Sequence, residues 1–166
     1  MTKSKITAIL LVLSAGANVA VAADSELDRA TLTGLHGVGV IVERLDAEVE
    51  RAGLTRGMLQ TDAELKLRLA GIQVLTDQEL DKEPGHPLLL LTPNILLRSG
   101  AFGCSVELLQ NVQLIRAPSV GTLAPTWSTS GVGVAPARRV LEDVRNTFKG
   151  LVDRFVNAYL AANPKK

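Results

Sequence analysis

Hydrophobic and polar residues alternate most regularly over residues 102–116, which form the clearest strand that the sequence predicts. One side of this segment is apolar and carries Phe102, Cys104, Val106, Leu108, Val112 and Leu114. The other side is polar and carries Ser105, Glu107, Asn111 and Gln113. Such alternation is typical of a strand with one buried and one solvated face. Gln110 interrupts the apolar side, which indicates either a bulge or a buried polar contact.

Shorter apolar runs predict four more strands, over residues 36–45, 72–75, 88–91 and 126–134. The run over residues 88–91 resumes after Pro93. Because a proline lacks a backbone N–H, we expect this second part of the strand to lie near a sheet edge or a bulge. We expect a loop over residues 118–125. The last strand would then return antiparallel to the long strand.

Apolar residues spaced three to four positions apart predict two main helices. The first is capped by Thr55 and stopped by Gly71, a residue suited to the left-handed conformation. The second begins at Pro136, a good first helical residue, and runs to about Leu160. Residues 76–79 fit the capping box of a single helical turn, and the charged segment 46–52 is expected to form a loop or a helical turn.

The order of these elements is strand, helix, strand, strand, long strand, strand, long helix. It predicts an α+β fold in which both main helices pack on one face of a mixed sheet of four to five strands. The first strand, helix and second strand would form a crossover unit, and the later strands a meander. We expect a single domain over residues 36–166, preceded by a flexible lead-in over 23–35.

Residues 1–22 have the three parts of a secretory signal peptide: basic Lys3 and Lys5, an apolar run over 6–15, and small residues before Ala22. A membrane-spanning helix needs about 20 apolar residues, so the run is too short to be one. The sequence therefore predicts an exported, periplasmic or secreted protein. No cysteine directly follows the apolar run, where a bacterial lipoprotein would carry one, so we expect no stable membrane anchor after signal removal.

Charge and cysteine content narrow the possible partners. Loss of Lys3 and Lys5 with the signal peptide leaves 16 basic and 17 acidic residues, a net charge near −1. Nothing in that balance favours nucleic acid or anionic lipid. Cys104 is the only cysteine, so no internal disulfide can form, and we interpret it as a small buried hydrophobe on a strand.

No set of residues predicts catalysis, a cofactor or a metal site. His36 and His86 lie fifty positions apart and Cys104 is alone, whereas metal ligands cluster. The segment around Ser119 resembles a nucleophile elbow, but a proline and a strand follow it where a helix is required. We therefore expect that the protein is not an enzyme.

Three residues are candidates for an interaction surface or a pocket: Trp127, Arg138 and Arg139. Trp127 is either a core anchor or an exposed aromatic of a binding surface. The two arginines follow Gly131 and Gly133 at a helix start, where backbone N–H groups can hold an anion, although the glycines also suit close packing of strand on helix. The acids Glu43, Asp46, Glu48 and Glu50 are interpreted as solvated residues rather than as a cation patch.

Several of these segments resemble a family of uncharacterised exported bacterial proteins. The resemblance covers GVGVIVERL, LTRGMLQTDAELKLRLAGIQVLT, SVELLQNVQLIR, TWSTSGVG and LVDRFVNAYLAANPKK, in this order. The layout is also similar, at the level of the fold, to the amino-terminal domain of TolB and to LpoB-type envelope proteins. The segments that carry this similarity are residues 67–75, 105–116, 127–130 and 151–160. It implies a protein-binding, noncatalytic role in the envelope.

The sequence thus predicts a noncatalytic protein-interaction module of the bacterial cell envelope. Its partner would be another envelope protein or a second copy of the chain. The alternative is a small-ligand carrier with an apolar pocket between the last helix and the sheet.

Overall fold

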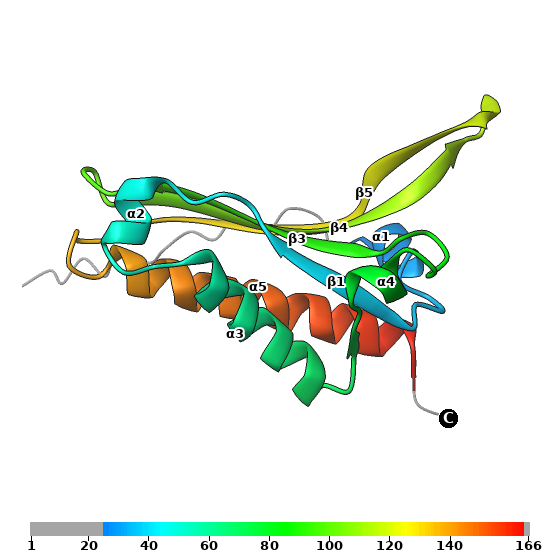
Figure 1. The fold of residues 1–166 in the computed structure, drawn as a ribbon, viewed down its shortest axis with the longest axis horizontal. Coiled ribbons are helices and arrows are strands. Elements are labelled where there is room, and N and C mark those ends of the chain that lie inside the picture. The colour runs from blue at the N-terminus through cyan, green and yellow to red at the C-terminus, as the bar shows by residue number, and fades with distance from the viewer. Residues whose placement is uncertain (1–24, 165–166) are drawn as a thin grey trace, which may run out of the picture.

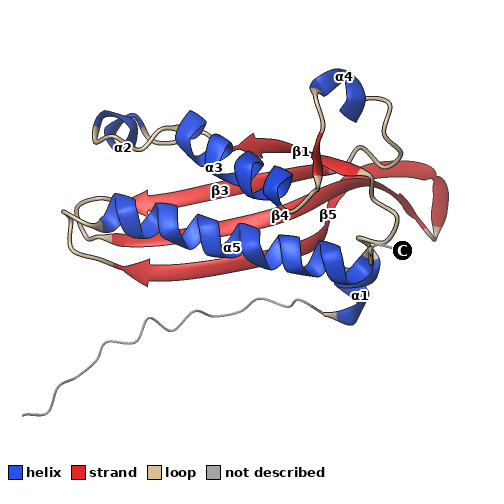
Figure 2. Cartoon of the chain, turned by 90° about the horizontal axis from the view of Figure 1, so that it is seen from below, coloured by secondary structure: helices blue, strands red, loops and turns tan. Residues whose placement is uncertain are grey.

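A five-stranded sheet with strand order β2-β1-β3-β4-β5 forms the frame of the computed structural model, which describes residues 25–164. The strands are β1 (Gly37–Val42), β2 (Gln73–Val74), β3 (Leu88–Leu96), β4 (Ala101–Leu114) and β5 (Ala117–Val134). The long helices α3 (Arg56–Leu69) and α5 (Val140–Ala162) lie on one face of the sheet (Figure 1 and Figure 2). The predicted α+β fold is confirmed, whereas the signal peptide predicted over 1–22 lies outside the described residues.

The sheet is mixed. β1 pairs in parallel with both β2 and β3, while β3, β4 and β5 pair antiparallel in chain order. Parallel neighbours need a crossover connection, and α3 lies within the one between β1 and β2. The parallel first pair and the later meander agree with the prediction.

Capping residues set the boundaries of α3 as the sequence predicts. The side chain of Thr55 accepts a hydrogen bond from the N–H of Met58, and the chain leaves the helix at Gly71 with φ of 79°. Thr76 and Glu79 cap each other reciprocally around α4 (Asp77–Leu80), the single turn that was expected.

The start of α5 differs from the prediction. Residues 137–139 form a turn, and the helix begins at Val140 rather than at Pro136. The N–H groups of both Arg139 and Val140 donate to the carbonyl of Pro136, so the proline opens the turn that leads into the helix.

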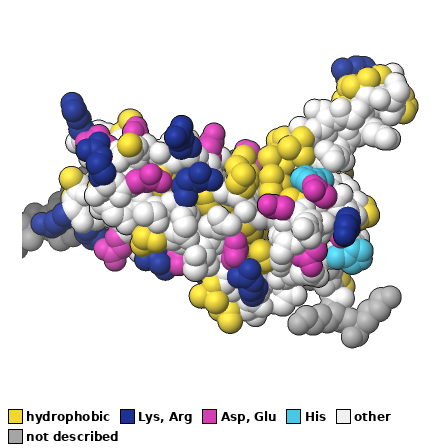
Figure 3. All heavy atoms as spheres, in the orientation of Figure 1, with side chains coloured by type: hydrophobic (Ala, Val, Ile, Leu, Met, Phe, Trp, Pro, Cys, Tyr) yellow, Lys and Arg dark blue, Asp and Glu magenta, His cyan; other side chains and the backbone are white. Residues whose placement is uncertain are grey.

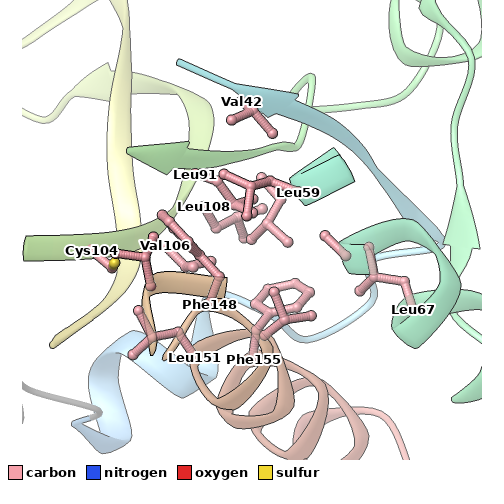
Figure 4. Close-up of a cluster of buried hydrophobic side chains, with 14 of the residues drawn as sticks. Val42, Leu59, Leu67, Leu91, Cys104, Val106, Leu108, Phe148, Leu151 and Phe155 are labelled. Carbon is pink, nitrogen blue, oxygen red and sulfur yellow. The ribbon is translucent and has the colours of Figure 1, made fainter. Parts of the chain in front are cut away.

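The core lies between the sheet and the two long helices. Figure 4 shows Leu91 of β3 and Leu108 of β4 beside Leu59 of α3, with Phe148 and Phe155 of α5 on the other side. All five side chains are buried. The opposite face of the sheet carries neither of the long helices (Figure 2).

An ion-pair cluster joins the two long helices. Arg145 of α5 donates to both carboxylate oxygens of Asp62 on α3, with Nη2 2.9 Å from Oδ1. Lys149 Nζ lies 3.7 Å from Oδ2 of the same carboxylate. The hydrogen bond from Arg145 is the main cause that lowers the pKa of Asp62, although partial burial opposes it.

Residues 25–35 differ from the flexible lead-in that was expected over 23–35. They contain helix α1 (Glu26–Ala30), in which Ser25 and Asp28 form a capping box. Leu32 is fully buried, and its carbonyl accepts a hydrogen bond of 2.8 Å from the side chain of Asn163. A buried leucine and this tie to the end of α5 order the segment.

The loop predicted over residues 118–125 is wrong, because β5 is continuous from Ala117 to Val134. Pro118 and Pro125 suggested a loop, yet prolines cost no ladder hydrogen bond on a strand with a free edge. β5 is the last strand of the sheet and pairs with no described strand other than β4, so it has a free edge at both Pro118 and Pro125.

The interruption at Gln110 marks a bulge. Leu108 pairs with Trp127 but Leu109 pairs with Pro125, so Thr126 is an extra residue on β5. Gln110 Nε2 donates to Thr126 Oγ1 at 2.7 Å, which makes the polar contact that the sequence offered as the other interpretation. Both are present.

Candidate functional site

A two-stranded arm extends beyond the sheet. β3 pairs with β4 only as far as Leu109, so residues 110–124, which we call the arm, continue as a ribbon of β4 and β5 alone. Figure 1 shows the arm leaving the body at the end that holds α1 and α4. A bulge increases the local twist and bend of its strand, which accounts for the change of direction at Thr126.

Hydrogen bonds brace the base of the arm. Besides its bond to Thr126, Gln110 Nε2 donates to the carbonyl of Thr31 at 3.3 Å. The N–H of Asn111 donates to the carbonyl of Gly85 at 2.7 Å. The arm is therefore held at its root by the segments that follow α1 and α4.

The outer part of the arm is apolar and exposed. Ile115 is 99% exposed at the turn, and Val120 and Leu123 are exposed along β5. Arg116 is the only charged residue of the arm. Figure 3 shows hydrophobic side chains gathered with a basic one at its far end.

A groove of about 900 Å³ lies at the opposite end of the molecule, between α2 (Ala47–Arg51) and the ends of β3 and β4. Its apolar lining includes Ile95, Leu96, Phe102 and Val132. The register places Asn94, Gly103 and Val132 in one row across β3, β4 and β5, on the face opposite α3 and α5. Ile95 and Phe102 alternate with these positions and pack against the core, so residues from both faces of the sheet line the groove.

The rim of the groove is charged. Arg44, Asp46 and Glu50 line it, which gives two acids against one base. Asp46 is the N-cap residue of α2, but its side chain makes no capping hydrogen bond. Among the described residues, neither Asp46 nor Glu50 forms an ion pair, so both carboxylates are available to a cation.

The structure does not bring the three predicted site residues together. Trp127 is 1% exposed and its ring meets that of Phe155 edge to face, so its side chain lies in the core. Arg138 and Arg139 are exposed in the turn before α5, where Arg139 Nη2 lies 3.4 Å from Asp143 Oδ1. Trp127 lines neither the groove nor the small cavity between α3 and α5.

The residues considered for catalysis or metal binding lie apart from the groove. His36 Nδ1 contacts Glu83 Oε1 at 2.9 Å, and Ser119 lies on the arm. His86 Nδ1 is 3.9 Å from Asp81 Oδ1. Within residues 25–164, no three side chains of His, Cys, Asp or Glu gather as a metal site would require.

Cys104 is buried on β4, as the sequence suggested. Burial raises the pKa of its thiol to about 12, so the thiol is neutral at physiological pH. A neutral, enclosed thiol is a poor nucleophile and metal ligand.

Sequence reasoning missed the arm and the groove. The signal for the arm was present, because apolar residues at Val112 and Leu114 prolong the alternation of β4 beyond the point where its pairing with β3 ends. The groove had no comparable signal, since Asp46 and Glu50 looked like solvated acids and the apolar lining comes from three separate strands.

Comparisons with known proteins add little to this geometry. No protein-family model matches the chain, and no curated protein matches its sequence. Among solved structures, a PelC dodecamer from Paraburkholderia phytofirmans is similar, with 12% sequence identity and a TM-score of 0.44 over 72% of this chain and 87% of that one. The resemblance to TolB and LpoB-type proteins stays a prediction. In the part of the chain that the structure describes, no helix has the length and hydrophobicity needed to cross a membrane.

Proposed function

We propose that this protein is a noncatalytic interaction module of the bacterial cell envelope, and that the arm is its binding element. The exposed apolar surface of the arm is the observation that carries the proposal. Isolated two-stranded ribbons are marginal in water, and a contiguous apolar patch on a soluble domain marks an interaction site. Placement in the envelope follows from the signal-peptide pattern of residues 1–22.

The construction of the arm supports a binding role. Its root is anchored by Gln110 and Asn111, whereas its tip exposes Ile115 beside Arg116. A braced ribbon presents its side chains in a defined direction, which lowers the entropic cost of binding. Arginine is enriched in protein–protein interfaces, and Arg116 is the one charged residue of the arm.

The test is site-specific photo-crosslinking in bacteria that express the full chain. A photo-reactive residue replaces Val120 on the arm, and a matched control replaces Leu69, which is 79% exposed on α3. We expect a discrete protein adduct in the envelope fraction from the Val120 position only. Equal labelling from both positions, or none from either, would count against the arm as a binding element.

Small-ligand carriage is a second candidate, and the groove favours it. Ligand pockets typically have volumes of about 300–1,000 Å³, a range that includes this groove. The site would lie beside α2 and not between the last helix and the sheet, where the sequence analysis expected it. A carrier would keep its ligand affinity after removal of residues 112–122, whereas an interaction module would lose its partner.

A further inference from the structure

The arm and the groove have complementary surfaces. The arm carries apolar side chains and one positive charge, Arg116. The groove is lined by Leu96, Phe102 and Val132 together with Asp46, Glu50 and Arg44, so its charged residues are two acids and one base. An apolar tip with a cation would thus meet an apolar floor with two acids at its rim.

The two surfaces also correspond in size and in availability. A volume of about 900 Å³ can take several side chains, as needed for the hairpin turn around Ile115 and Arg116. Neither Arg116 nor the two acids has an ion-pair partner among the described residues. Docking would therefore form a new ion pair without breaking an existing one.

The arm cannot fill the groove of its own chain. The arm leaves the sheet at the end that holds α1 and α4, whereas α2, which lines the groove, lies at the other end (Figure 1). An arm that reaches such a groove must come from another molecule. Since every copy has both surfaces, a second copy of the chain meets all the requirements.

We infer that the arm of one copy binds in the groove of a second copy, so that the protein assembles head to tail. This inference rests on the proposed function and names the partner of the arm. The contact is heterologous, because two different surfaces meet. Any assembly that is not closed keeps one free arm at one end and one free groove at the other. Further copies can add there until a ring closes, and an assembly that cannot close stays an open filament.

The test uses the full chain, purified from the envelope fraction, in analytical ultracentrifugation. Ile115→Asp disables the arm and Leu96→Asp disables the groove. Both positions are exposed in the single molecule, Leu96 at 67%, so neither change disturbs the core. Leu69→Asp is the matched control on α3. We expect assemblies larger than a dimer for the unmodified chain and the control, and monomers for each of the other two variants.

Mixing the two defective variants provides the sharper result. Ile115→Asp keeps an intact groove and Leu96→Asp keeps an intact arm, so a mixture can form one contact per pair and no more. Head-to-tail assembly therefore predicts 1:1 dimers without larger species. A symmetric contact of arm on arm or of groove on groove would instead leave one of the two variants able to dimerise by itself, and that result would overturn the inference.

Two further outcomes separate this inference from the proposed function. If the unmodified chain is monomeric but the Val120 position crosslinks a different envelope protein, self-assembly is wrong while the interaction role stands. If the unmodified chain is monomeric and binds phosphatidylethanolamine–phosphatidylglycerol vesicles through Ile115, a lipid surface takes the place of the second copy and the inference is again wrong. A monomer that yields no adduct contradicts both proposals.

Discussion

The indole ring of Trp127 meets the phenyl ring of Phe155 edge to face, with centroids 5.2 Å apart and an angle of 70° between the planes. Trp127 comes from β5 and Phe155 from α5, so the pair joins the edge of the sheet to the helix that covers it. Both side chains are almost fully buried. Aromatic pairs in this geometry add about 0.5–1.5 kcal/mol to the effect of burial.

Truncation of this pair should destabilise the domain strongly. Phe155→Ala removes a buried ring and leaves a cavity against Trp127, which costs about 3–5 kcal/mol in the free energy of unfolding. Urea denaturation followed by circular dichroism measures the change. Leu69→Ala, at an exposed site of α3, is the control and should stay within about 0.5 kcal/mol of the unmodified chain. If Phe155→Ala lowered the free energy of unfolding by no more than this control does, the two rings would not pack against each other.

The contact between Asp62 and Arg145 should make stability depend on pH in acid. The pKa of Asp62 is lowered in the folded state, so the folded state favours the carboxylate. Its contribution is present above the ordinary aspartate pKa of about 3.9 and is lost as the pH falls through the lower folded value. Asp62→Asn should therefore cost about 1 kcal/mol at pH 7 and progressively less as the pH falls below the ordinary aspartate pKa.

Unfolding curves of the unmodified chain and Asp62→Asn at several pH values test this dependence. Glu64→Gln is a suitable control, because Glu64 pairs with Arg68 on the same helix and does not join α3 to α5. A difference for Asp62→Asn that stays constant down to pH 2 would show that the carboxylate charge is not the source of the stabilisation.

Cys104 should be inert in the folded protein. Its pKa of about 12 and its burial leave almost no accessible thiolate at pH 8. A disulfide reagent such as 5,5′-dithiobis(2-nitrobenzoic acid) should modify no thiol of the folded chain within minutes and one thiol per chain after unfolding in urea. Rapid reaction without urea would place the thiol at the surface.

The body of the fold could be predicted because its signals are local. Thr55 and Gly71 bound α3, the capping box of Thr76 marks α4, and alternation over 102–108 identifies the buried side of β4. Each signal involves residues within a few positions of one another. The stripe of α5 likewise predicted which face packs on the sheet.

The remaining features depend on contacts between distant segments. Residues 25–35 have no clear period, yet Leu32 is buried and tied to Asn163. Prolines suggested a loop at 118–125, where pairing with β4 maintains a strand. The groove exists only because α2 lies beside the ends of β3 and β4, and no pattern along the chain contains that relationship.

Charge reversal should show whether Arg116 meets the acids of the groove. Arg116→Glu places a like charge beside Asp46 and Glu50 and should weaken self-association about tenfold or more, equivalent to about 1.4 kcal/mol. Adding Glu50→Arg to the same chain supplies an opposite charge and should recover much of the affinity, because paired residues show coupling of about 0.5–3 kcal/mol in a double-mutant cycle.

Sedimentation over a range of protein concentrations gives the association constants of the unmodified chain, the two single variants and the double variant. Arg68→Glu, at an exposed position of α3, is the matched control and should leave the assembly unchanged. If the two single effects simply add in the double variant, Arg116 and Glu50 do not meet, and the docking of arm in groove would have to use another orientation.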